Sequence, residues 1–212
     1  EGVTSTQQTK PAAAAQQPDG YGARLGGFAA RYGIFLALVL LCAVLALVSE
    51  HFLSTRNILN VLRQSSINGI LAIGMTFVIL TRGIDLSVGS LVALTGVVAA
   101  SLATTSSTAM VAGGPYPAFL ALAAGIAVGM AAGGVSGLAV ARFAVPAFVA
   151  TLGMLSAGRG LTLLYSGGRP VPALTPEFRW IGTGDILGIP MPVVLFGLVF
   201  LGAWWVLTYS RF

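Results

Sequence analysis

Apolar residues gather in long, continuous blocks along this chain. Charged residues are absent from five stretches, 33–49, 65–81, 86–141, 143–158 and 186–210. A helix needs about 20 mainly apolar residues to cross the hydrocarbon core of a bilayer, whereas the strands of a membrane barrel alternate in polarity. The pattern therefore predicts an all-α, polytopic transmembrane helical bundle. Six spans are expected, at about 33–50, 62–81, 87–104, 118–140, 146–165 and 188–208.

The N-terminal end differs in composition from the rest. Residues 1–23 are rich in Gln, Ala and Pro and have little to bury, so they are predicted to be a disordered tail, followed by a membrane domain over 24–212. The first apolar stretch could also be a signal peptide, because Arg24 and Arg31 precede it. Its 17 residues, 33–49, exceed the usual core of about 7–15 residues, so a retained first span is expected.

Charge is sparse and scattered. Charged residues make up 8% of the chain, against about 25% in a soluble domain. The net charge is +5, but the basic residues form no patch, which argues against nucleic acid as a partner. Membrane lipid is the expected surroundings, and the basic residues are expected to set the orientation of the chain in the bilayer.

Basic residues concentrate on the cytoplasmic side of membrane proteins. Lys10, Arg24 and Arg31 therefore predict a cytoplasmic N-terminus. With six crossings the same rule is satisfied at three further residues, Arg82, Arg142 and Arg211. The segment 51–64 carries basic residues on the opposite side and disagrees with the rule.

Several chemistries lack the residues they need. Lys10 is the only lysine, His51 the only histidine and Cys42 the only cysteine. A disulfide framework, a P-loop lysine and a multi-histidine metal site are thereby excluded. We expect no cofactor, no metal and no enzymatic activity, and any ATP that drives this protein must be bound by another chain.

Small residues recur every four positions in the fourth expected span. Such a stripe lets another helix approach backbone to backbone, which is how membrane helices gain van der Waals contact. A helix-packing face is therefore predicted, formed by Ala121, Gly125, Gly129, Gly133, Gly137 and Ala141.

Polar residues at membrane depth are costly and often functional. One group leads into the second span, namely Asn57, Asn60, Gln64, Ser66 and Asn68. These residues could line a substrate path, or they could form an interfacial helix start with Asn57 or Asn60 as its cap.

A second candidate, Arg159, lies within the fifth span, between two glycines. Its side chain could extend outward to the interface, or it could pair with a group inside the bundle. Both alternatives stay open.

A third candidate is the segment 80–90, L-T-R-G-I-D-L-S-V-G-S. Gly83 permits a turn, and Asp85 or Ser87 could cap the third helix, where the helix dipole favours an acid. Arg82 would be a topological anchor. The alternative is a pore-lining or gating role for Asp85.

Two blocks carry a family resemblance. They are residues 57–94, NILNVLRQSSINGILAIGMTFVILTRGIDLSVGSLVAL, and residues 145–172, VPAFVATLGMLSAGRGLTLLYSGGRPVP. Both resemble the membrane subunits of ribose-type sugar ABC importers, within the branched-chain amino acid/sugar permease superfamily.

The resemblance implies a multi-pass permease of the bacterial inner membrane, which forms a translocation path with a second copy or a paralogue. It also implies a separate cytoplasmic ATPase subunit and an extracytoplasmic sugar-binding protein as partners. Another solute, such as a branched-chain amino acid or a nucleoside, is the alternative within the class. An ion-coupled secondary transporter fits less well, because Asp85 is the one acid near a span and no second half repeats it.

The chain departs from the family pattern at two places. Arg82 stands where the family usually has a small or uncharged residue. Family members continue through about ten spans, with a cytoplasmic ATPase-docking segment shortly after a stretch like Y-S-R-F, and this sequence stops at that stretch, residues 209–212. We therefore expect an incomplete permease domain that lacks the docking segment and the C-terminal spans.

Overall fold

The computed structural model describes residues 21–106, 111 and 114–210, and side chains within those ranges from residue 31 onward. The predicted tail, 1–23, lies outside the described residues except for its last three, which begin the first helix. The chain divides into two compact units, Glu1–Ser54 and Thr55–Phe212, and each is described by itself.

The first unit contains α1, Tyr21–Val48. Its stretch Arg31–Val48 is apolar enough to cross a membrane, with a mean hydropathy of 2.5. The expected span at 33–50 is therefore present, with the helix beginning earlier than the apolar run. A turn follows α1, in which the hydroxyl of Ser54 donates to the carbonyl of His51 at 2.7 Å.

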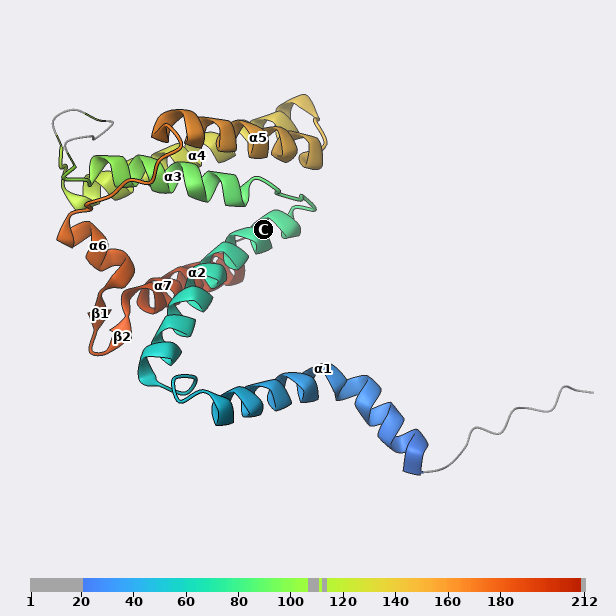
Figure 1. Cartoon of the computed structure of the whole chain (residues 1–212). Helices are drawn as coiled ribbons and strands as arrows, with labels where there is room; N and C mark the ends of the chain where they lie inside the picture. Colours follow the sequence, from blue (N-terminus) through green and yellow to red (C-terminus); the bar gives the residue numbers. More distant parts are fainter. Residues whose placement is uncertain (1–20, 107–110, 112–113, 211–212) are drawn as a thin grey trace, which may run out of the picture. The chain divides into compact units, whose positions relative to one another are not determined.

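The second unit consists of long helices joined by short connections (Figure 1). Its elements are α2 (Thr55–Leu80), α3 (Val88–Leu102), α4 (Ala118–Phe143), α5 (Ala147–Ser166), α6 (Pro176–Thr183), β1 (Asp185–Ile186), β2 (Ile189–Pro190) and α7 (Met191–Tyr209). In the described part of the chain, α1, α2, α4, α5 and α7 are long and apolar enough to span a bilayer, while α3 is apolar but has 15 residues. The all-α polytopic prediction is confirmed.

Prolines and left-handed residues set several helix ends. Pro117, Pro146 and Pro190 occupy the position just before α4, α5 and α7, where the missing N–H of proline costs nothing. Ala144 ends α4 and Gly167 ends α5, both with a left-handed backbone, which satisfies the last carbonyls of each helix.

Within the second unit, α3 packs against both α4 and α5, and α2 packs against α7 (Figure 1). Glycines lie in these contacts. A Cβ added at Gly158 of α5 would lie 2.9 Å from the Oγ of Ser90 in α3, and one added at Gly69 of α2 would lie 2.5 Å from the ring of Phe196 in α7. These approaches give the van der Waals contact that holds helices together in lipid.

The predicted glycine stripe of α4 has two different surroundings. A Cβ added at Gly125 would lie 3.1 Å from the Thr95 carbonyl oxygen, and one at Gly129 would lie 3.2 Å from the Thr95 Cγ2. At Gly133 and Gly137 it would meet nothing within 4 Å in the described structure. The N-terminal half of the stripe, with Gly125 and Gly129, therefore contacts α3. A packing role for Gly133 and Gly137 stays a prediction.

Loop contacts divide the second unit into two ends. At one, which we call the Thr104 end, Thr104 forms a β-bridge with Leu174, and Thr175 N donates to the Ala103 oxygen at 2.9 Å. At the other, the Asp85 end, Thr151 Oγ1 donates to the Ile84 oxygen at 3.0 Å. Since α3 and α5 both run from the Asp85 end to the Thr104 end, they lie parallel.

The segment between α5 and α7 contains structure that the sequence pattern did not predict. The short helix α6 and the β1–β2 hairpin fill the expected loop at the Thr104 end. Arg63, in the first turns of α2, donates from Nη2 to the oxygen of Thr183 at 3.1 Å. A guanidinium at the last carbonyls of α6 also complements the negative end of the helix dipole, so α6 is attached to α2.

Candidate functional site

Buried hydroxyl groups concentrate where α3 meets α5. Most of the buried polar side chains in the described structure belong to these two helices or to the residues beside their ends, namely Ser87, Ser90, Ser101, Thr104, Thr151 and Ser166. Several of these hydroxyls donate to nearby backbone carbonyls; for example, Ser90 Oγ donates to the Ser87 oxygen at 2.8 Å. The α3–α5 contact is thus the most polar interior surface of the second unit, and we treat the groove along it as the candidate site.

At the Asp85 end, the carboxylate of Asp85 fixes the start of α3. Its Oδ1 accepts hydrogen bonds from the backbone N of Ser87 at 2.7 Å and from the Ser87 hydroxyl at 2.6 Å. Ser87 is the residue before the helix but makes no side-chain cap hydrogen bond of its own. Asp85 therefore closes an Asx-type turn onto Ser87, the residue just before the helix, while a pore-lining or gating role stays untested.

The turn before Asp85 is made differently from the expectation. Arg82, not Gly83, takes the left-handed backbone, with φ of 59°. Gly83 N donates to the Val78 oxygen at 3.0 Å, and a Cβ on Gly83 would lie 3.2 Å from the Val78 side chain. Gly83 thus permits a close approach to Val78, and Arg82 adopts a conformation that favours glycine.

The middle of the groove holds a cavity of about 430 Å³. Ser90 and Ala93 line it from α3, and Arg159 and Thr162 line it from α5. The Arg159 side chain is exposed, and no hydrogen bond or ion pair engages its guanidinium within the described residues. Of the two alternatives for Arg159, pairing inside the bundle is therefore not realised by the described part of the chain.

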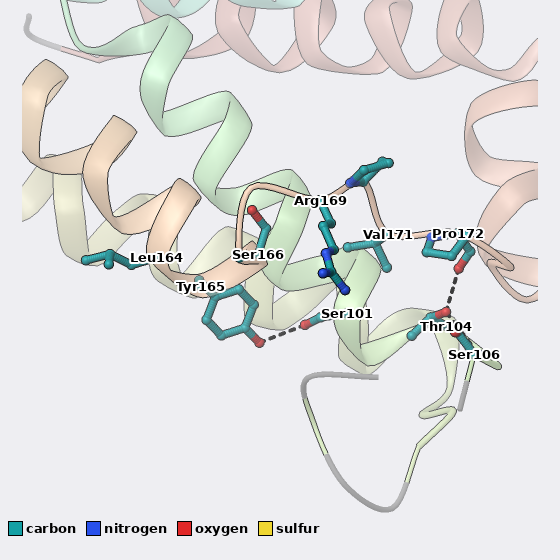
Figure 2. Close-up of a pocket in the computed structure, with 11 residues that line it drawn as sticks. Ser101, Thr104, Ser106, Leu164, Tyr165, Ser166, Arg169, Val171 and Pro172 are labelled. Atoms are coloured by element: carbon teal, nitrogen blue, oxygen red, sulfur yellow. Dashed lines mark hydrogen bonds between the residues drawn. The ribbon is translucent and has the colours of Figure 1, made fainter. Parts of the chain in front are cut away.

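A larger cavity, of about 680 Å³, lies at the Thr104 end of the groove (Figure 2). It is lined by Ser101, Thr104, Ser106, Leu164, Tyr165, Ser166, Gly167, Arg169, Pro170, Val171 and Pro172. We call it the outer cavity, because it lies nearer the ends of α3 and α5 than the middle cavity does. Ser101 Oγ and the Tyr165 hydroxyl lie 2.7 Å apart across it, joining α3 to α5.

Helix geometry relates the two cavities. Leu155, Arg159 and Thr162 border the middle cavity and Ser166 borders the outer one. Their spacing of four, three and four residues places them on one face of α5. A line of guanidinium and hydroxyl groups therefore runs along this face from the middle of the helix to the Thr104 end.

The candidate residues of the second span lie elsewhere. α2 packs mainly against α7, and its side chains there serve local contacts. Asn60 Oδ1 accepts from Arg63 Nη1 at 3.4 Å, and Ser66 is buried and donates to the Leu62 oxygen at 2.7 Å. Gln64 and Asn68 are exposed and Asn57 is half-buried. The structure thus places Asp85, Ser87 and Arg159 along the α3–α5 groove and the α2 residues apart from it.

The sequence pattern does not single out the residues that line the outer cavity. Ser101, Tyr165 and Arg169 lie at span ends, where hydroxyls and arginines are common and carry little signal. One usable signal exists: Ser90 and Ser101 are eleven residues apart, which is about three helical turns and one face. Both of these serines are buried against α5.

The fold and the groove define a polytopic helical membrane protein with hydroxyl-rich cavities between two of its helices. The chain belongs to the family described as the branched-chain amino acid transport system permease component, whose model matches residues 57–212. Within this family, the chain is similar to several proteins named as ribose import permeases.

The ribose import permease protein RbsC of Escherichia coli (strain K12) is 46% identical over 180 residues, 83% of this chain and 53% of that protein. The protein of the same name from Haemophilus influenzae is 43% identical over 188 residues, 87% of this chain and 55% of the relative. The Bacillus subtilis protein is 39% identical, covering 88% and 56%. The resemblance to ribose-type permeases is confirmed, and the chain spans about half the length of these relatives. No solved structure matches the chain.

Proposed function

We propose that this chain is part of the permease subunit of an ABC importer and forms the translocation path for a monosaccharide, ribose being the first candidate. The observation that carries the proposal is the 46% identity to a ribose import permease over 83% of the chain. Other relatives are named as permeases for D-allose, at 36% identity, and for L-arabinose, at 35%. A monosaccharide is therefore the expected class of solute.

The groove between α3 and α5 suits such a solute. A sugar brings hydroxyl groups that both donate and accept, and a path with neutral hydroxyls offers exchangeable hydrogen bonds that let it enter and leave. Ser90 and Thr162 in the middle cavity and Tyr165 in the outer cavity supply such groups. Arg159 adds donors in the middle of the path.

Energy and delivery come from other chains in this proposal. ATP binding and hydrolysis by a cytoplasmic ATPase subunit shift the permease between outward-open and inward-open states. ATP can do so only because the assembly binds it with different affinities in the two states. An extracytoplasmic sugar-binding protein delivers the solute, and a second permease copy or a paralogue completes the path. The assembly lies in the bacterial inner membrane with the N-terminus in the cytoplasm. In the six-span topology Thr104 follows the third crossing, so the Thr104 end faces outward.

Reconstitution tests the proposal. The full-length permease, its ATPase and its binding protein are placed in proteoliposomes, and uptake of labelled ribose, D-allose, L-arabinose, leucine and a nucleoside is measured with ATP on the side of the ATPase. ATP-dependent uptake of a monosaccharide is expected. Uptake of leucine or the nucleoside alone would replace the sugar assignment, and uptake of sugar without the ATPase would contradict the coupling to ATP.

The orientation has its own test. Single cysteines are introduced at Ile186, in β1 at the Thr104 end, and at Arg142, in the last turn of α4 at the opposite end, in a full-length chain otherwise free of cysteine. A membrane-impermeant thiol reagent applied to intact cells is expected to label the Ile186→Cys variant and to label the Arg142→Cys variant only after lysis. The reverse pattern would overturn the cytoplasmic N-terminus.

A further inference from the structure

We propose that the outer cavity is a low-affinity binding site for a neutral, polyhydroxylated ligand of monosaccharide size. The proposal deepens the proposed function, on which it rests for the identity of the solute, and it assigns a place and residues for the first contact within the permease.

The size of the outer cavity fits a small ligand. Its volume of about 680 Å³ lies inside the range of roughly 300–1,000 Å³ that small-molecule sites occupy. Its lining mixes hydroxyl groups with the apolar surfaces of Val171, Pro170 and Pro172. A sugar has the same mixture, since its hydroxyls project from a ring whose C–H faces are apolar.

The Ser101–Tyr165 pair offers a hydrogen bond of either polarity. Ser101 is 2% exposed, and its one hydroxyl proton can go to the Val98 oxygen, at 2.8 Å, or to Tyr165, at 2.7 Å. In the first case Tyr165 donates to Ser101 and its oxygen can accept from a ligand. In the second case the phenolic proton of Tyr165 can be donated to a ligand. A sugar hydroxyl, which both donates and accepts, matches either arrangement.

Arg169 adds donors on the other side of the cavity. Figure 2 shows its side chain extending toward the Ser101–Tyr165 pair. It is exposed, and no hydrogen bond or ion pair within the described structure engages its guanidinium. The planar fork of the guanidinium can donate to two adjacent oxygens of one ligand.

Charge in the cavity separates ligand classes. None of the described residues that line it is an Asp or a Glu, so a cationic ligand would lack a counter-charge beside Arg169. An anionic ligand would pair with Arg169, but the remaining lining groups are neutral and a net charge is costly to carry further into the membrane. A neutral ligand needs hydrogen bonds alone, which the lining supplies.

The wall of the cavity is held before any ligand arrives. Thr104 Oγ1 donates to the Pro172 oxygen at 2.6 Å, and Thr105 N donates to the Ala173 oxygen at 2.9 Å. Together with the β-bridge from Thr104 to Leu174, these bonds fasten the 172–175 segment to the end of α3. A wall that is already ordered lowers the entropy lost on binding.

Thiol protection in the assembled transporter tests the site without depending on transport. A single cysteine is introduced as Val171→Cys, which lines the cavity, in the full-length permease otherwise free of cysteine and assembled with its ATPase, and the rate of reaction with a hydrophilic maleimide is measured. Ribose, without the binding protein, is expected to slow this reaction, by about five-fold when its concentration is four times the dissociation constant. The matched control is Ile186→Cys, on the same end of the molecule in β1, whose rate is expected to stay unchanged.

Second substitutions assign the residues. Tyr165→Phe removes one hydrogen bond and is expected to raise the half-protecting ribose concentration by about two- to ten-fold, whereas Tyr209→Phe, at the far end of α7, leaves it unchanged. Arg169→Gln is expected to raise it, and Arg179→Gln, in α6 outside the cavity lining, is not. Equal half-protecting concentrations in the cavity variants and their controls would overturn these assignments.

The outcomes separate this proposal from the proposed function. If reconstituted transporter imports a monosaccharide but ribose and that monosaccharide fail to protect Val171→Cys, the site is wrong and the function stands. Protection by ribose 5-phosphate and not by ribose would overturn the neutral ligand class. If no monosaccharide is imported while ribose protects, the site stands and the proposed function fails.

Discussion

Gly125→Ala and Gly137→Ala are the same change on the same helix, yet the structure predicts opposite effects on stability. Both glycines belong to the four-residue repeat of α4. Gly125 is buried against α3, whereas Gly137 is exposed and an added Cβ there would meet nothing within 4 Å among the described residues. The pair therefore compares a packed and an unpacked position, with helix propensity held constant.

The geometry sets the expected magnitude. Alanine is favoured over glycine in a helix by up to about 1 kcal/mol, so Gly137→Ala is expected to be neutral or stabilising by that amount. At Gly125 the added methyl would lie 3.1 Å from the Thr95 carbonyl oxygen and 3.2 Å from the Ala99 Cβ. Relief requires α3 and α4 to separate, because the oxygen is part of a helical backbone, and overpacking costs about 1–3 kcal/mol. The two variants should thus differ by about 1–3 kcal/mol, which is more than five-fold in the folding equilibrium.

Equilibrium unfolding of the full-length permease in mixed detergent micelles measures this difference. Gly129→Ala gives an intermediate point, because its nearest contact, 3.2 Å to the Thr95 Cγ2, is to a side chain rather than to backbone. The expected order of stability is Gly137→Ala, then Gly129→Ala, then Gly125→Ala. Equal losses at Gly125 and Gly137 would refute the reasoning, since the stripe would then be packed along its whole length.

Substitutions at three further residues test the hydrogen bonds that hold the second unit. Asp85→Asn retains an acceptor oxygen and is expected to keep the fold. Asp85→Ala should cost about 1–3 kcal/mol, because the backbone N–H of the buried Ser87 loses its acceptor. An intact fold with lost uptake in the Asn variant would indicate a gating role. Arg63→Gln removes the contact to Thr183 and should speed amide hydrogen exchange in α6 by up to about five-fold, a change of at most about 1 kcal/mol. Arg56→Gln, at an exposed arginine of the same helix, is the control. Unchanged exchange in the Arg63 variant would show that this contact does not stabilise α6. Thr151→Val should destabilise the full-length permease by about 0.6–1.7 kcal/mol in the same unfolding measurement. The control is Thr76→Val, whose hydroxyl bonds only within its own helix. Equal losses in the two variants would contradict a stabilising bond between α5 and the segment before α3.

The spans were predictable because one property defines them. The expected span 118–140 corresponds to α4, Ala118–Phe143, and 188–208 corresponds to α7, Met191–Tyr209. The length of an uncharged stretch is enough to identify such a span. The observed helix bounds differ from the predicted ones by a few residues, because the helices extend beyond the apolar run. α6 has 8 residues with an acid in its first turn, and it depends on packing and on the Arg63 contact, which no local pattern reveals.

The candidate site was predictable only where a residue stood out from its surroundings. Arg159 was found because a charge inside an apolar run is rare. The Ser101–Tyr165 hydrogen bond joins residues 64 positions apart, and each is ordinary where it stands. The α2 residues were selected for polarity at membrane depth, but polarity does not tell which neighbour a helix will choose, and α2 packs mainly against α7.

Arg63 also bears on the orientation. In the predicted topology it is a basic residue on the outer side, against the positive-inside rule. In the structure its Nη1 donates to Asn60 and its Nη2 donates to Thr183 at the end of α6, so this charge has a structural partner at the Thr104 end. An arginine that stabilises the fold at a given end of the molecule is weak evidence about which end faces the cytoplasm. The exception at 51–64 therefore counts less against a cytoplasmic N-terminus than a freely hydrated arginine would, and labelling at Ile186 and Arg142 measures the orientation directly.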